Sequence, residues 1–65
     1  MKVQEGQKKL IKSKLPDVNI SKCSIVAEGG NDNGKTFYGS FMVKVSIGAG
    51  DEYYRFDDGE VKKIQ

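Results

Sequence analysis

This sequence of 65 residues has no histidine and a single cysteine, Cys23. A lone cysteine cannot form a disulfide within the chain, and a zinc site needs several histidine or cysteine ligands. Acid–base catalysis would depend on carboxylates, tyrosine or lysine, and Cys23 has no histidine base to activate it as a nucleophile. We therefore predict that the protein is not an enzyme, holds no cofactor or metal, and keeps Cys23 as a buried structural thiol.

Long apolar runs are also absent. No segment approaches the roughly 20 consecutive apolar residues that a membrane-spanning helix needs. Met1 and Lys2 are not followed by the apolar stretch of a signal peptide. As written, the sequence predicts a cytoplasmic protein with no transmembrane segment, or an extracytoplasmic one if a leader has been removed. The short length predicts a single domain, residues 1–65.

The strongest positive signal is an alternating pattern over residues 36–47. A period of two predicts a strand with one buried face and one exposed face. The parity expected to face inward holds Phe37, Gly39, Phe41, Val43, Val45 and Ile47. The outward parity holds Tyr38, Ser40, Met42, Lys44 and Ser46. Gly39 is expected to mark a bulge or a place where the helix backbone comes close.

The remaining segments predict one helix and three further strands. Residues 3–15 are expected to form a helix with Val3, Leu10, Ile11 and Leu15 on one side, ended by Pro16. Gly6 is expected to weaken its first turn by about 1 kcal/mol. We expect a strand at 18–28 with Cys23, Ile25 and Ala27 inward, and either a bulge or bend near 21–22 or a strand that begins only there. Further strands are expected at 52–56 and 60–64, and loops at 29–35, 48–51 and 57–59. The predicted fold is α+β, with one N-terminal helix packed on a four-stranded antiparallel meander.

The face of this sheet that lacks the helix is the first candidate site. It is expected to carry Tyr38, Met42, Lys44, Tyr53 and Arg55. Tyrosine, methionine and arginine are enriched in protein interfaces. The short last strand also leaves an edge to which another strand could add. These features favour a small binding or regulatory module with a protein partner, which for so small a domain includes a second copy in a homodimer.

Nucleic acid is the alternative partner. The predicted helix carries Lys8, Lys9, Lys12 and Lys14, and the exposed strand faces carry Tyr38 and Tyr53. Cations that follow a phosphate backbone and aromatic rings that stack on bases are typical of single-stranded nucleic-acid binding. The acidic turns, which include Asp57 and Asp58, would repel phosphate.

Charge and loop composition give two further signals. Lysines concentrate in residues 1–22 and acids in residues 51–60, so the surface is expected to be bipolar. The segment Asn31-Asp32-Asn33-Gly34 is similar to part of a calcium loop, but Gly29 and Ser40 stand where an acid and the bidentate glutamate would be needed. We therefore expect a hairpin loop there, and ordinary turn chemistry at 57–60.

The order of these segments resembles the PepSY-type repeat unit. The shared features are a lysine-rich helix closed by Leu15-Pro16-Asp17, the long strand TFYGSFMVKVSI at 36–47 and the terminal YYRFDDGEVKKI at 53–64. The resemblance implies a bacterial, extracytoplasmic or membrane-associated module that inhibits or regulates a protease and has no catalytic residues. The glycine-rich loop at 29–34 and the lack of an export signal depart from that family. The lysine- and asparagine-rich composition is also typical of small phage or mobile-element proteins.

Overall fold

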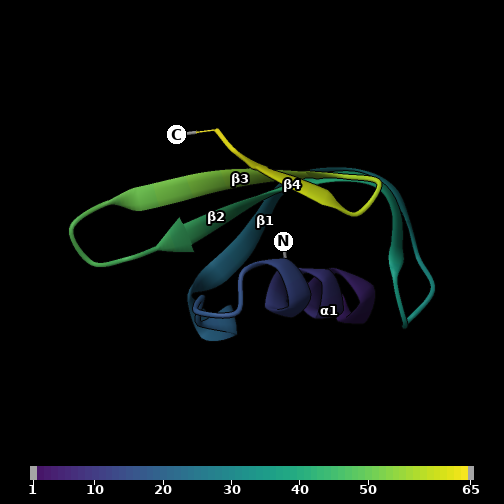
Figure 1. The fold of residues 1–65 in the computed structure, drawn as a ribbon, viewed down its shortest axis with the longest axis horizontal. Helices are drawn as coiled ribbons and strands as arrows, with labels where there is room; N and C mark the ends of the chain where they lie inside the picture. The colour runs from purple at the N-terminus through teal and green to yellow at the C-terminus, as the bar shows by residue number, and fades with distance from the viewer. Residues whose placement is uncertain (1, 65) are drawn as a thin grey trace.

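The computed structural model describes residues 2–64 and confirms the α+β fold. One helix, α1 (Glu5–Lys14), precedes a short 3-10 helix, η1 (Ile20–Lys22), and the strands β1 (Cys23–Asp32), β2 (Phe37–Ser46), β3 (Asp51–Asp57) and β4 (Glu60–Lys63). The strands form one antiparallel sheet in the order β1-β2-β3-β4. α1 lies under one face of the sheet and crosses the strands, so the molecule has two layers (Figure 1).

The core fills the space between α1 and the sheet. Phe41 stacks on Phe56 of β3, its direct cross-strand partner, with ring centroids 4.7 Å apart. Phe37 meets the edge of Phe41 at 5.1 Å. The buried apolar side chains are Ile11, Ile25, Phe37, Phe41, Val43, Val45 and Phe56. The inward parity predicted for β2 is therefore confirmed at its four large side chains.

The N-terminus of α1 is capped from a distant strand. The Asp32 carboxylate, at the end of β1, accepts hydrogen bonds from the backbone N–H groups of Gly6 at 2.8 Å and Gln7 at 3.2 Å. The buried Gln7 side chain accepts from the Gln4 backbone N–H at 2.9 Å and donates to Glu28 at 3.0 Å. An anionic cap suits the positive end of a helix, so these bonds fix α1 against β1.

The predicted first strand is wrong in part of its parity. Two alternatives were expected near residues 21–22, a bend within the strand or a strand that begins only there. The structure has the second, because residues 20–22 form η1 and β1 begins at Cys23. The bulge lies further on: Ile25 pairs with Val43 and Ala27 with Met42, which leaves Val26 without a partner. An extra residue reverses the alternation. Ala27 was expected inward, but it lies on the face opposite α1 beside Met42.

The predicted loop at 29–35 is too long, because β1 continues to Asp32. Gly30 pairs with Gly39, with φ of 153° and 118°, and a Cβ on Gly39 would lie 2.3 Å from the Gly29 carbonyl oxygen. Gly39 therefore allows close contact with β1 and not with the helix. Figure 1 shows the β1–β2 hairpin bending towards the start of α1. The helix comes close at Gly6, where a Cβ would lie 2.4 Å from the Thr36 carbonyl carbon.

The ends of two strands also differ from the prediction. Ile47 was expected to face the core, but β2 ends at Ser46 and Ile47 is 54% exposed. The Ile47 N–H bonds to the Gly50 carbonyl oxygen, which closes the turn before β3. β4 ends at Lys63, and Ile64 is exposed. Within the described residues, no helix is long and apolar enough to cross a membrane.

Candidate functional site

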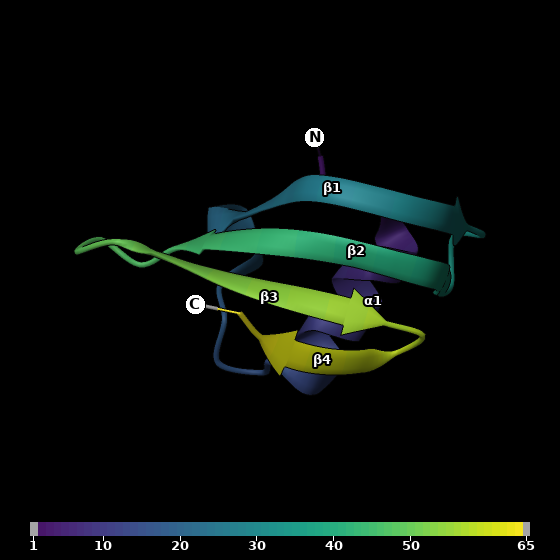
Figure 2. The same ribbon diagram turned by 90° about the horizontal axis from the view of Figure 1, so that it is seen from above.

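The face of the sheet opposite α1, called here the open face, carries all five side chains proposed for protein binding. Phe41, Val43 and Phe56 point towards α1, so their strand neighbours point the other way. Lys44 pairs with Tyr53 and Met42 with Arg55 across β2 and β3. Tyr38 lies towards the hairpin tip and is 62% exposed. Figure 2 shows this face towards the viewer, with α1 behind the sheet.

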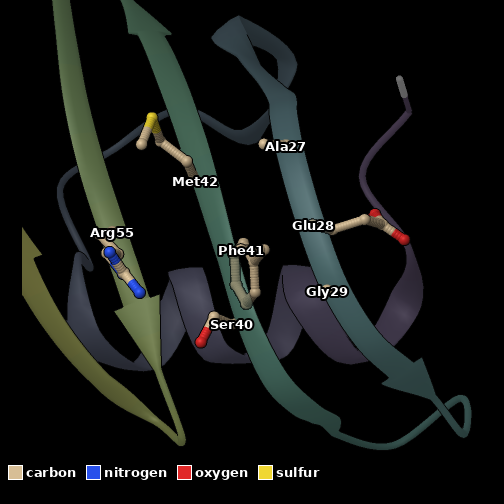
Figure 3. Close-up of a pocket in the computed structure, with 7 residues that line it drawn as sticks. All are labelled: Ala27, Glu28, Gly29, Ser40, Phe41, Met42 and Arg55. Carbon is tan, nitrogen blue, oxygen red and sulfur yellow. The ribbon is translucent and has the colours of Figure 1, made fainter.

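A hollow of about 210 Å³ lies in the middle of the open face. The β1 bulge brings Ala27 beside Met42, and Gly29 lies beside Ser40. These three small residues leave a gap that Met42 and Arg55 border (Figure 3). Sequence reasoning missed Ala27 and Gly29 as site residues. A regular strand would turn them towards α1, and only the bulge at the unpaired Val26 turns them to the open face.

Charged side chains on the open face form two neighbouring rows. In the acidic row, Asp57 of β3 pairs with Glu60 of β4, and the neutral Ser40 of β2 continues the row. In the basic row, Arg55 of β3 pairs with Lys62 of β4, and the neutral Met42 of β2 continues it. Ser40 Oγ donates a hydrogen bond to Asp57 Oδ1 at 2.9 Å. Sequence reasoning missed Lys62, although it has the same parity as Arg55 once the two-residue turn at 58–59 is known. The open face therefore offers adjacent cationic and anionic contacts around a hollow.

The four helix lysines do not share a surface with the tyrosines of the open face. Lys8, Lys9, Lys12 and Lys14 belong to α1, and the sheet separates α1 from Tyr38 and Tyr53. Lys9, Lys12 and Lys14 are exposed, and Lys8 is half-buried. The structure therefore divides the residues of the nucleic-acid alternative between two opposite faces.

The other candidate sites have structural partners. Burial raises the pKa of the half-buried Cys23 thiol, whose Sγ lies 3.5 Å from the Asn19 carbonyl oxygen. A raised pKa makes a thiol less nucleophilic at neutral pH. In the loop that is similar to a calcium site, Asp32 Oδ1 accepts from the Gly34 N–H at 2.7 Å while Oδ2 caps α1. Among residues 2–64, no group of three or more potential metal ligands comes together.

One ion pair lies on the helix side of the sheet. Lys63 Nζ lies 2.9 Å from Glu52, which also accepts a hydrogen bond from the Tyr54 hydroxyl at 2.9 Å. The Lys63 hydrogen bond, with a smaller effect from Tyr54, lowers the pKa of Glu52, and the Glu52 hydrogen bond raises the pKa of Lys63. Glu52 therefore stabilises the fold above its unfolded-state pKa and loses that effect as the pH falls through its folded-state pKa. This cluster joins β3 to β4.

The open face remains the surface with the most features of a binding site. It combines an exposed tyrosine, a hollow and charges that form no ion pair among residues 2–64, on strands that the core holds in place. These groups can form contacts with a partner through burial, stacking and charge. No family model, no curated protein and no solved structure matches this chain.

Proposed function

We propose that this protein is a small non-enzymatic binding or regulatory module that contacts a protein partner through the open face. The observation that supports this most is that the described chain covers one face of its sheet with α1 and leaves the other uncovered. A four-stranded sheet with a packed core holds the uncovered side chains in a fixed arrangement. Rigid display of that kind lowers the entropy cost of binding.

The composition of the open face supports a protein as the partner. Tyr38, Tyr53, Met42 and Arg55 are of the types enriched at the centre of protein interfaces. The hollow beside Met42 offers a place for a partner side chain. A regulatory role, inhibition of a protease included, rests on the PepSY-like resemblance alone.

Substitutions on the open face are expected to weaken partner binding without unfolding the protein. Tyr38→Ala and Arg55→Ala each truncate an exposed side chain, so the free energy of unfolding should change by less than about 0.5 kcal/mol. If either residue is a binding hot spot, affinity should fall at least about 30-fold, equivalent to roughly 2 kcal/mol. The measurement is affinity capture from an extract of the source cell, with titration of each captured protein.

Lys12→Ala on the opposite side of the molecule is the matched control, because Lys12 is also exposed. It should leave capture unchanged. If the open-face variants capture the same proteins as the original chain with equal affinity, the open face is not the contact surface.

The alternative function, single-stranded nucleic-acid binding, predicts a different result. Phosphate contacts would make affinity fall steeply with salt, and combined Lys8→Glu, Lys9→Glu and Lys12→Glu changes would remove it. Because α1 and the tyrosines lie on opposite faces, we expect no binding of a mixed-sequence oligonucleotide at low salt, measured by fluorescence anisotropy. Salt-sensitive binding that these three changes abolish would favour the alternative instead.

A further inference from the structure

We propose that the partner of the open face is a second copy of this chain, bound in a two-fold symmetric dimer. This inference rests on the proposed function and identifies its partner. It starts from two like-charge pairs: Arg55 stands directly opposite Lys62, and Asp57 directly opposite Glu60. Like charges that face each other across paired strands lower stability. Local conflicts of this kind are expected at functional or strained sites.

The four side chains of these pairs are exposed. Between residues 2 and 64, the only ion pair joins Lys63 to Glu52 on the other side of the sheet. The Ser40 hydroxyl supplies Asp57 with a hydrogen bond but no charge. Arg55 and Lys62 therefore display two neighbouring positive charges, and Asp57 and Glu60 two neighbouring negative charges. Among residues 2–64 these four groups form no ion pair with one another, although the two rows of one chain lie close enough to attract each other.

The order of the rows makes the open face complementary to itself. Neighbouring rows on one face of a sheet lie about 7 Å apart. Consider two copies whose open faces meet, related by a two-fold axis in the plane between the two sheets. The axis runs across the strands, midway between the acidic and basic rows. It places the acidic row of each copy opposite the basic row of the other. Asp57 of each copy then faces Arg55 of the other, and Glu60 faces Lys62. Each isologous contact occurs twice, as this symmetry requires.

The same operation matches shape as well as charge. Ser40 of one copy faces Met42 of the other, and Ser40 borders the hollow that Ala27 and Gly29 leave open. Met42 of the second copy therefore lies above this hollow and can enter it. Packed sheets lie about 10 Å apart, a separation that long charged side chains and methionine can bridge. Methionine adapts well to irregular gaps of this kind.

The size of the face predicts a reversible dimer. The longest and shortest extents of the molecule, 33 Å and 19 Å, span the sheet face. Their product, roughly 600 Å², is an upper limit on the flat area that each copy can offer, somewhat below the ~800 Å² per partner of a standard interface. We therefore expect a dissociation constant in the micromolar range that rises with salt, because the exposed charge pairs are screened.

Charge reversal tests this arrangement directly. Arg55→Asp places an acid opposite Asp57 of the second copy, and Asp57→Arg places a cation opposite Arg55 of the second copy. Each variant alone should therefore have a dimer dissociation constant at least about 30-fold higher than that of the original chain. An equimolar mixture should form a heterodimer close to the original affinity, because each reversed charge then faces its opposite. Sedimentation equilibrium from low micromolar to millimolar concentration measures all three samples.

The variants should fold, because each reversal also relieves a like-charge pair within its own chain. Far-ultraviolet circular dichroism checks this. Lys9→Glu on exposed α1 and Asp17→Arg after Pro16 are the matched charge controls, and each should leave dimerisation unchanged.

Three results would each overturn the proposed dimer. The original chain could remain monomeric at millimolar concentration, both reversals could leave association unchanged, or the mixture could fail to recover it. The original chain could be a monomer that captures another protein, and the open-face variants could bind that protein more weakly. This result would exclude a second copy as the partner and support the proposed protein-binding function. Capture of the same proteins with equal affinity by the open-face variants would show that the open face is not the contact surface.

Discussion

Replacement of Phe41 by alanine is expected to lower the free energy of unfolding by about 3–5 kcal/mol. Phe41 is 2% exposed, and its ring stacks on Phe56 and meets the edge of Phe37. Its removal takes away the central ring of three and leaves a cavity between α1 and the sheet. A domain this small has a net stability of only about 3–5 kcal/mol from its core, so most of the variant should be unfolded at room temperature.

Urea unfolding followed by circular dichroism measures this effect. Tyr38→Ala is the matched control, because it removes a ring from the same strand at a position that is 62% exposed. It should change the free energy of unfolding by less than about 0.5 kcal/mol. Both proteins are compared at low concentration, where the proposed dimer contributes nothing. A Phe41→Ala protein as stable as the Tyr38→Ala control would show that Phe41 lies outside the core.

The parts of the fold that depend on local pattern could be predicted from the sequence. Alternation over residues 37–45 fixes both the strand β2 and its buried side, because each second side chain must face the same way. Pro16 cannot continue a helix, and α1 ends two residues before it. The short Asp58-Gly59 turn forces β3 and β4 to pair as neighbours. Each of these inferences uses residues close together in the chain.

The features that sequence reasoning missed depend on contacts between distant segments. The β1 bulge falls at Val26, a β-branched residue that fits a regular strand equally well. Its position is set by pairing with β2, which the β1 residues alone do not encode. Asp32 reads as an ordinary turn residue, and only the folded chain places its carboxylate on the N-terminus of α1.

The candidate site divides in the same way. Tyr38, Met42, Lys44, Tyr53 and Arg55 could be assigned to one face because strand parity alone decides their direction. The hollow beside them depends on the bulge, and the opposed rows of charge depend on the register between β2, β3 and β4. Residue composition predicted a protein-binding surface there, whereas the proposed two-fold dimer rests on the order of the charged rows across β3 and β4.

Replacement of Gly6 by alanine should destabilise the protein, although helix propensity predicts the reverse. In an isolated helix this change gains about 1 kcal/mol. Here the new Cβ would lie 2.4 Å from the Thr36 carbonyl carbon and 2.7 Å from Asp32 Oδ2. Because the nearest Thr36 atoms belong to the backbone, no side-chain rotation can relieve this contact, and the hairpin must move away from α1. We expect a net loss of about 2–4 kcal/mol, from overpacking and from weaker capping by Asp32.

Chemical denaturation of Gly6→Ala and three further variants separates these causes. Ser13→Ala, at an exposed site of the same helix, should raise stability by a few tenths of a kcal/mol through propensity alone. Asp32→Ala removes the cap and should cost about 1–2 kcal/mol. The double variant Gly6→Ala with Asp32→Ala should then cost less than the sum of the single changes, because both disrupt the same contact. Full additivity, or a Gly6→Ala protein more stable than the original, would mean that the hairpin does not press on the start of α1.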